Sequence, residues 1–146
     1  MISRTLKLVR EVTRLSAPKI ANAMGMARRT YYSFEAGKGE FSFARIWRFA
    51  EATGADPMAI IYAVIYGEPE IAVRSMENQG ASIGAASFKR FNDRVGDRMT
   101  NIASSIWIEA LKRPYDCLEE HLEKRDQSTE RWLAENIPKL FPRDED

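Results

Sequence analysis

Chemically reactive residues are scarce in this sequence. Its 146 residues include one cysteine, Cys117, and one histidine, His121. A single cysteine excludes an intrachain disulfide and gives no sign of an oxidising compartment. The sequence also has no glycine-rich phosphate-binding loop after a strand and no acid pair in a pocket-like context, so it offers few groups for catalysis. We therefore expect a protein that is not an enzyme and that uses no cofactor.

Metal ligands are equally scarce. Cys117 and His121 are one helical turn apart, so two chains could together complete a tetrahedral site. A thiol beside Leu118 is more often a buried filler, however, and an imidazole among glutamates is more often a surface residue. We predict no metal site.

Long apolar runs are absent as well. No stretch approaches the ~20 apolar residues that are needed to cross a bilayer. The chain does not begin with a basic segment followed by an apolar signal core. We expect a soluble, cytoplasmic protein with no membrane partner.

The alternation of apolar and polar residues that marks a β-strand never persists, whereas apolar residues recur at spacings of three and four. The sequence therefore predicts an all-α fold. Five helices are expected before residue 67: one ending before Ser16, one from a Ser16 cap to a stop at Gly25, one over 28–35, one from Ser42 to Gly54, and one capped by Asp56 with Pro57 at its first position.

The rest of the chain changes character. Residues 67–87, with Gly80 and Gly84 among small side chains, indicate a linker that holds at most one short helix around 71–76. Residues 88–146 predict a small helical domain for oligomerisation or interaction. Its first helix should be long and amphipathic, because six apolar residues follow one another at spacings of 3, 4, 4, 3 and 4: Phe88, Phe91, Val95, Met99, Ile102 and Ile106.

Later breaks in this domain are expected at its prolines. Pro114 should end or kink the long helix, and Asp116 with Glu119 resembles a capping box for the next one. A last helix should begin near Trp132 and stop at Pro138.

Charge is divided between the two halves. Residues 1–66 contain 10 Lys and Arg against 5 Asp and Glu, a balance of +5, whereas residues 67–146 contain 12 against 16, a balance of −4. A basic half followed by an acidic half is typical of a chain whose first part faces a polyanion. Random fluctuation in composition would produce the same numbers, so charge alone does not decide the function.

The segment MGMARRTYYSFEAG, residues 24–37, lies between two predicted helix stops and opens the third helix with two arginines. Together with the helix before it, this segment predicts a tandem in which one helix steadies a second that can enter the major groove of DNA. Residues 4–65 resemble the Xre or lambda-repressor-like helix-turn-helix family. The matching features are Leu15-Ser16, Ile20-Ala21, Met24-Gly25, Arg28, Thr30, Phe34-Glu35, Gly37, Ile46, Ala50, Gly54 and Ile60-Ile61.

The resemblance implies a base-reading surface on the third helix. Arg28, Arg29 and Ser33 match positions that project toward base edges, and Tyr32 lies near enough to join them. A solvated first turn is the alternative for the two arginines, but cations are disfavoured at the positive end of a helix dipole, so an anion is expected nearby. Tyr31 matches an inward apolar position, so we expect Tyr31 to pack in the core and Tyr32 to face out.

The same resemblance implies supporting contacts. Arg10 and Glu35 match an ion pair that bridges the first and third helices and orients the third. Contacts to DNA phosphates are implied for four residues: Thr30, Lys38, Arg45 and Arg48.

Four residues depart from the family pattern. Ala17 and Pro18 replace a polar residue that usually contacts phosphate, and Ala27 replaces the usual serine or threonine cap of the third helix, a loss of ~1 kcal/mol. Glu40 places a negative charge in a loop that normally approaches the DNA backbone.

Family members usually bind two half-sites ~34 Å apart as dimers. We expect a homo-oligomer, a dimer or higher, and two surfaces could form it. One lies on the fifth helix, through Met58, Ile61, Val64 and Ile65; the other is the stripe from Phe88 to Ile106, which could instead form the core of a C-terminal bundle.

The expected function is sequence-specific binding of double-stranded DNA by a transcriptional regulator, most simply a repressor of bacterial or phage type. The alternatives are an antitoxin-type regulator whose acidic half binds a protein partner, an activator that touches polymerase, and an interaction adaptor that has lost DNA binding.

Overall fold

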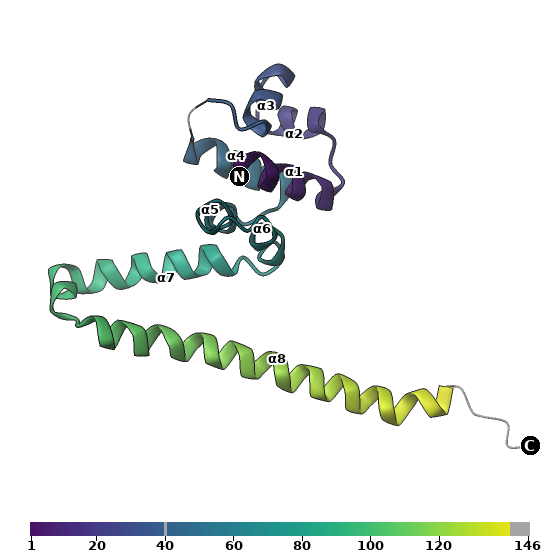
Figure 1. Cartoon of the computed structure of the whole chain (residues 1–146), viewed down its shortest axis with the longest axis vertical. Helices are drawn as coiled ribbons and strands as arrows, with labels where there is room; N and C mark the ends of the chain where they lie inside the picture. The colour runs from purple at the N-terminus through teal and green to yellow at the C-terminus, as the bar shows by residue number, and fades with distance from the viewer. Residues whose placement is uncertain (40, 141–146) are drawn as a thin grey trace, which may run out of the picture. The chain divides into compact units, whose positions relative to one another are not determined.

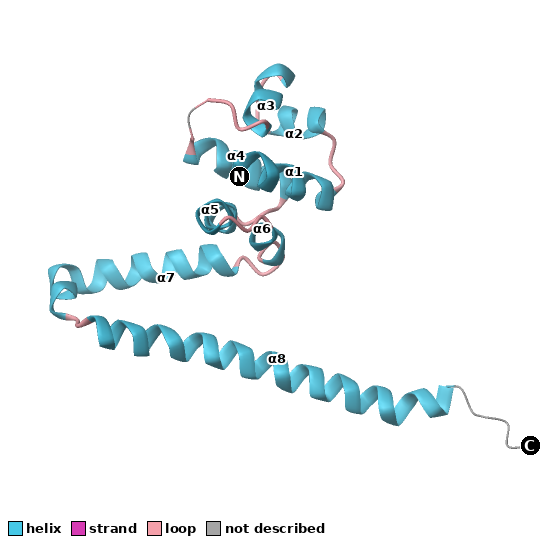
Figure 2. Cartoon of the chain, in the orientation of Figure 1, coloured by secondary structure: helices cyan, strands magenta, loops and turns pink. Residues whose placement is uncertain are grey.

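The computed structural model describes residues 1–39 and 41–140, and side chains as far as Ile137. The described residues form eight α-helices and one 3₁₀-helix, with no strand among them (Figure 2). The predicted all-α fold is therefore confirmed. The chain divides into two compact units, Met1–Arg94 and Val95–Asp146.

The first five helices begin and end close to the predicted positions. They are α1 (Ile2–Thr13), α2 (Ala17–Ala23), α3 (Arg28–Glu35), α4 (Phe43–Thr53) and α5 (Pro57–Tyr66) (Figure 1). The side chains of Ser16, Ser42 and Asp56 cap α2, α4 and α5 by accepting hydrogen bonds from amides in the first turn. Gly54 and Gly67 end α4 and α5 in the left-handed conformation. Local capping chemistry thus fixes most of these boundaries.

One hydrophobic core joins these helices. It includes eight fully or almost fully buried side chains from α1 to α5: Leu6, Val9, Ile20, Tyr31, Ile46, Phe49, Ala59 and Ile60. The α5 helix is apolar on nearly every side because it packs against α1, α4 and the short helix α6 (Glu70–Arg74). Only its end, at Ile65 and Tyr66, is strongly exposed.

The expected linker over 67–87 is mostly helical. The α6 helix packs on α1 and α5 and buries Ala72, and α7 (Gly80–Val95) begins seven residues before the predicted end of the linker. The first compact unit accordingly extends to Arg94 rather than to residue 66. Small residues such as Ala72 allow α6 to pack closely. The same small residues are also typical of a flexible linker, so the sequence pattern did not separate the two possibilities.

Asp56 explains why this segment is ordered. Its carboxylate accepts hydrogen bonds from the Met58 and Ala59 amides at 3.0 and 3.2 Å, from the Ser75 hydroxyl at 2.9 Å, and from the amide and hydroxyl of Ser82 at 3.1 and 2.5 Å. Burial would raise the pKa of Asp56, but these hydrogen bonds outweigh it and hold the pKa below its ordinary value. One side chain therefore caps α5 and ties the first turn of α7 to it.

The long helix expected over 88–106 is interrupted. It ends at Val95, Gly96 takes the left-handed conformation with φ of 52°, and a 3₁₀-helix, η1 (Gly96–Asn101), follows. The last helix, α8 (Ser104–Leu140), then continues without a break.

The expected stop at Pro138 is wrong, and Pro114 does not end a helix, because both prolines lie inside α8. Asp116 with Glu119 is likewise not a capping box, since no helix begins there. The predicted C-terminal bundle also differs from the structure: no described side chain after Ala72 is buried.

Candidate nucleic-acid interface

The α3 helix follows α2 through a tight turn. Gly25 has φ of 65°, and the amides of Gly25 and Met26 donate to the carbonyls of Asn22 and Ala21, both at 3.0 Å. The residue before α3, Ala27, makes no side-chain capping hydrogen bond. The first amides of α3 are therefore available to an external acceptor.

The inner face of α3 is held by aromatic packing. Tyr31 and Phe34 are buried, and the Phe34 ring lies 6.3 Å from the Tyr31 ring and 6.0 Å from the Phe49 ring of α4, between centroids. These rings fix which face of α3 points inward. As predicted, Tyr31 faces the core, whereas Tyr32 is 52% exposed.

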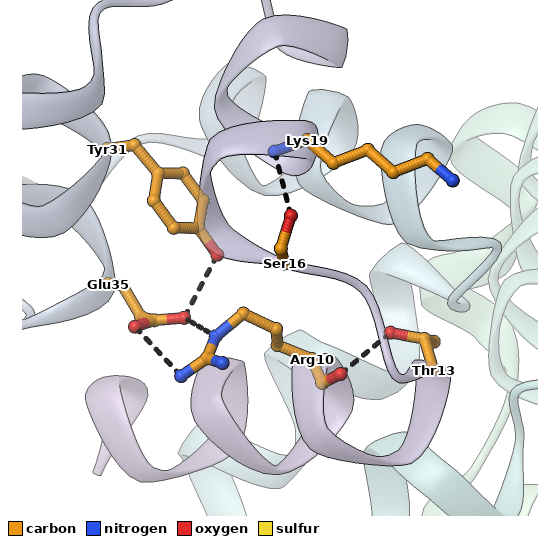
Figure 3. Close-up of polar contacts among 6 residues, drawn as sticks. All are labelled: Arg10, Thr13, Ser16, Lys19, Tyr31 and Glu35. Atoms are coloured by element: carbon orange, nitrogen blue, oxygen red, sulfur yellow. Dashed lines mark hydrogen bonds and ion pairs between the residues drawn. The ribbon is translucent and has the colours of Figure 1, made fainter.

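A polar network fixes the same helix to α1. The Arg10 guanidinium donates to both carboxylate oxygens of Glu35, from Nε to Oε1 at 2.5 Å and from Nη2 to Oε2 at 3.4 Å (Figure 3). The Tyr31 hydroxyl donates to Glu35 Oε1 at 2.9 Å. Glu35 is 5% exposed, so this carboxylate gains its hydrogen bonds from protein rather than water. The predicted pair between Arg10 and Glu35 is present, and Tyr31 is an additional member that the sequence did not identify.

The titration of this network follows from its contacts. The hydrogen bond to Glu35 raises the pKa of Arg10 against the opposing effect of burial. Burial, and then the hydrogen bond to the Glu35 carboxylate, raise the pKa of Tyr31. Arg10 therefore stays charged and Tyr31 stays neutral throughout the ordinary pH range.

The outer face of α3 carries the predicted base-reading residues. Arg28, Arg29, Tyr32 and Ser33 are all exposed and line one shallow hollow. Ala36 and Lys38 also line it. Within the described ranges, 1–39 and 41–140, no ion pair engages Arg28 or Arg29. The hollow is thus a cationic surface with one phenol and one hydroxyl.

Of the four predicted phosphate contacts, only Lys38 lines this hollow. Lys38 lines the hollow beside α3, and Thr30 is exposed on α3. Arg45 and Arg48 lie on α4, where Arg45 is half-buried and Arg48 is exposed, and neither lines that hollow. Glu40, the acidic departure from the family pattern, lies outside the described residues.

The predicted oligomerisation residues are spread over four elements, α5, α7, η1 and α8, and the short connection before α8. On α5, Ile61 is 7% exposed and belongs to the core, so it offers little surface to a partner; Met58 and Val64 are half-buried, and Ile65 is exposed. In the second set, Phe88 and Ile106 are exposed, and four residues are half-buried: Phe91, Val95, Met99 and Ile102. The break at Gly96 means that this set does not form one continuous helical stripe.

The described part of the chain contains no group of three or more histidine, cysteine or acidic residues that could hold a metal ion. Cys117 is exposed on α8, which corrects the expectation of a buried thiol. The sequence did not identify Ser75 and Ser82 as hydrogen-bond partners of Asp56. Both lie in a segment that resembled a linker, where a serine hydroxyl alone does not indicate a partner.

Among the residues that the structure describes, no helix is both long and apolar enough to cross a membrane. Comparisons with protein-family models, with curated proteins and with solved structures found no match.

Proposed function

We propose that this chain is a sequence-specific DNA-binding transcriptional regulator of the Xre or lambda-repressor-like helix-turn-helix type. In this proposal it acts as a repressor that places α3 in the major groove of each operator half-site and binds as a dimer or higher oligomer. The observation that carries the proposal is the outer face of α3, where Arg28, Arg29, Tyr32 and Ser33 share one exposed hollow.

The physical support comes from how that face is held. A reading surface must keep its side chains in register with base edges, and the Arg10–Glu35–Tyr31 network fixes α3 against α1 at hydrogen-bond distance. Two arginines at the start of a helix oppose its dipole. Bound phosphates or guanine acceptors would offset that cost, and no described acidic side chain pairs with either arginine.

Each exposed group has a chemical role in this proposal. An arginine fork pairs with the O6 and N7 atoms of guanine and contributes about 1–3 kcal/mol of discrimination against the wrong base. Tyr32 contacts a thymine methyl group or a phosphate, and Ser33 accepts or donates one hydrogen bond at a base edge. Lys38 and the uncapped amides of α3 bind phosphates, which fix register without specifying sequence.

The proposal is tested by binding to a selected duplex and to random duplexes over a range of salt concentrations. A DNA reader should lose affinity steeply as salt rises and should keep a specificity ratio of ~10³ or more. Lys38→Ala should weaken both duplexes alike and reduce the salt slope by about one. Equal affinity for all duplexes at every salt concentration would contradict sequence-specific reading.

An aromatic patch favours a second candidate, a protein-interaction adaptor or antitoxin-type regulator. Phe41 and Phe43 stack edge to face with centroids 5.1 Å apart, and both are exposed, as is Trp47 on α4. Exposed aromatic clusters are enriched at protein interfaces. Under this alternative, Trp47→Ala should abolish capture of a protein partner, whereas Arg28→Ala should not affect it.

A further inference from the structure

The α8 helix carries an apolar stripe that its own unit does not cover. The α8 stripe consists of five residues at spacings of 3, 4, 3 and 4: Ile108, Leu111, Tyr115, Leu118 and Leu122. Each of these side chains is 50–70% exposed. The only other described helix of the second unit is η1, which has six residues. An apolar surface of this kind on a long helix needs a covering partner.

The spacing identifies the shape of that partner. Alternating spacings of three and four average 3.5 residues, which is the repeat that keeps one seam of a helix facing another helix in a coiled coil. In this heptad reading, Ile108, Tyr115 and Leu122 occupy one seam position, and Leu111 and Leu118 occupy the other. The matching surface is therefore another amphipathic helix with the same repeat.

The charges beside the stripe are complementary to those of a second copy of the chain. Lys112 and Glu119 follow Leu111 and Leu118 and occupy equivalent flanking positions, seven residues apart. If two α8 helices run antiparallel with Leu111 opposite Leu122 of the other copy, Tyr115 lies opposite Leu118. In that register, Lys112 of each copy lies beside Glu119 of the other, so the symmetric pair contains two opposite-charge contacts.

A parallel pair fits the charges less well. Arg125 continues the stripe at a spacing of three after Leu122, so a parallel arrangement would place the two Arg125 side chains opposite each other. In the antiparallel register, Arg125 lies opposite Ile108 of the second copy. Its aliphatic stem can cover that side chain while the guanidinium remains in water.

We infer that α8 is an antiparallel self-association surface, in which the stripes of two copies pack together and Lys112 of each copy pairs with Glu119 of the other. The earlier oligomerisation residues stop at Ile106, so this surface differs from those predicted from the sequence. The pairing deepens the proposed function by supplying two α3 helices, but it does not need DNA. Its tests measure association of the full chain without DNA, so their failure is distinguishable from failure of the proposed function.

The first test is sedimentation equilibrium of the full chain and two variants. Leu118→Glu should weaken self-association by at least ~100-fold, because each pair loses two buried leucines and gains two charges in the seam. Ile106→Glu is the comparison variant, because Ile106 has a similar exposure on α8, 55% against 60% for Leu118, but belongs to the earlier predicted set and lies on the face opposite the seam. Loss of association with Ile106→Glu alone, or a wild-type chain that stays monomeric at high concentration, would overturn the inference.

The second test reverses the flanking charges. Lys112→Glu should weaken association about tenfold, because both opposite-charge contacts become repulsive. Adding Glu119→Lys should restore the wild-type affinity. Arg113→Glu is the control, because it makes the same charge change one residue further on, at an outward position. Equal effects of the Lys112 and Arg113 changes, or no rescue by the double variant, would contradict this register.

The third test measures the direction of the two helices. A spin label is placed at residue 127 through Gln127→Cys in a Cys117→Ser background, which removes the only native cysteine. In the antiparallel register, the two labels lie about 32 Å apart along the helix axis, from a rise of 1.5 Å per residue. A parallel pair would bring them within roughly 20 Å, because paired helix axes are only 8–10 Å apart. The shorter distance would overturn the antiparallel arrangement.

Discussion

Leu6 in α1 and Leu118 in α8 both lie on amphipathic helices, but Leu6 is fully buried and Leu118 is 60% exposed. In the first unit, the apolar face of α1 belongs to one core that it shares with five other helices, α2 to α6. In the second unit, η1 is the only other helix that the structure describes, and it has six residues. The difference teaches that an apolar stripe predicts burial without saying which molecule provides the covering surface.

Two charged pairs within the first unit also differ in their surroundings. The Arg10–Glu35 pair joins α1 to α3, and its two residues are 25 positions apart in the sequence. The Glu35 side chain is almost completely buried. The Lys89–Asp93 pair lies within one exposed helix, with both side chains more than half exposed. Substitutions at the enclosed pair and at the exposed pair should therefore have effects of very different size.

Removal of Glu35 should have the largest effect on stability. Glu35→Ala leaves the Arg10 guanidinium and the Tyr31 hydroxyl without their acceptor, so we expect the free energy of unfolding to fall by about 2–4 kcal/mol. Chemical denaturation measures this change. Glu51→Ala, at an exposed position of α4, is the control and should change stability little. Equal effects would show that the network does not hold α3.

Asp56→Ala should come next, with a loss of about 2–3 kcal/mol. The variant loses the cap of α5 and the hydrogen bonds that tie Ser75 and Ser82 to it. Ser82→Ala removes only one of these bonds and should cost about 1 kcal/mol. Hydrogen exchange should show that the first turn of α7 opens in Asp56→Ala; unchanged protection there would contradict the tie.

The pH dependence of stability provides a separate test of Asp56. Its folded pKa is lowered, so its contribution is fully present above the unfolded value of about 3.9 and is lost as the pH falls through the lower folded pKa. Stability should therefore decline with acidification below about pH 4, and Asp56→Asn should make that decline shallower. If stability declined with acidification as steeply in Asp56→Asn as in the wild-type chain, other carboxylates would be responsible for the decline.

Arg28→Ala and Arg29→Ala should change DNA binding but not stability. Each should relax preference at one or two base pairs, which corresponds to about 1–3 kcal/mol of discrimination. Arg74→Ala, at an exposed position of α6, is the matched control and should keep the wild-type preference. Competition binding with single-base variants of a selected duplex measures the effect.

Lys89→Ala should have the smallest effect. Its pair with Asp93 is solvent-exposed, so water replaces the lost contact, and the denaturation midpoint should remain within experimental error. A clear loss of stability would mean that this exposed pair contributes to the stability of the first unit.

The sequence predicted those parts of the fold that local chemistry determines. Ser16, Ser42 and Asp56 marked helix starts because a cap acts within three residues. The inward Tyr31 and outward Tyr32 followed from the family resemblance. The bonds of Asp56 to Ser75 and Ser82 span 19 and 26 residues, and no local pattern signals such distant partners.

The prolines show where a local rule misled. Pro114 lacks an amide hydrogen and is expected to interrupt a helix, but α8 continues through it. Gly96 lies inside the helix predicted over 88–106, but it is the residue at which the chain leaves that helix. Proline and glycine are both residue types at which a helix can break. The chain breaks at Gly96 and continues as a helix through Pro114, so the residue type alone does not determine the result.

The central claim, that the outer face of α3 reads base pairs, is tested most directly by in vitro selection of bound duplexes with the wild-type chain and the Arg28→Ala, Arg29→Ala double variant. We predict that the wild-type chain enriches two related half-sites containing guanines and that the double variant loses preference at those guanines. Enrichment of the same site by both proteins, or no enrichment by the wild-type chain, would contradict the claim.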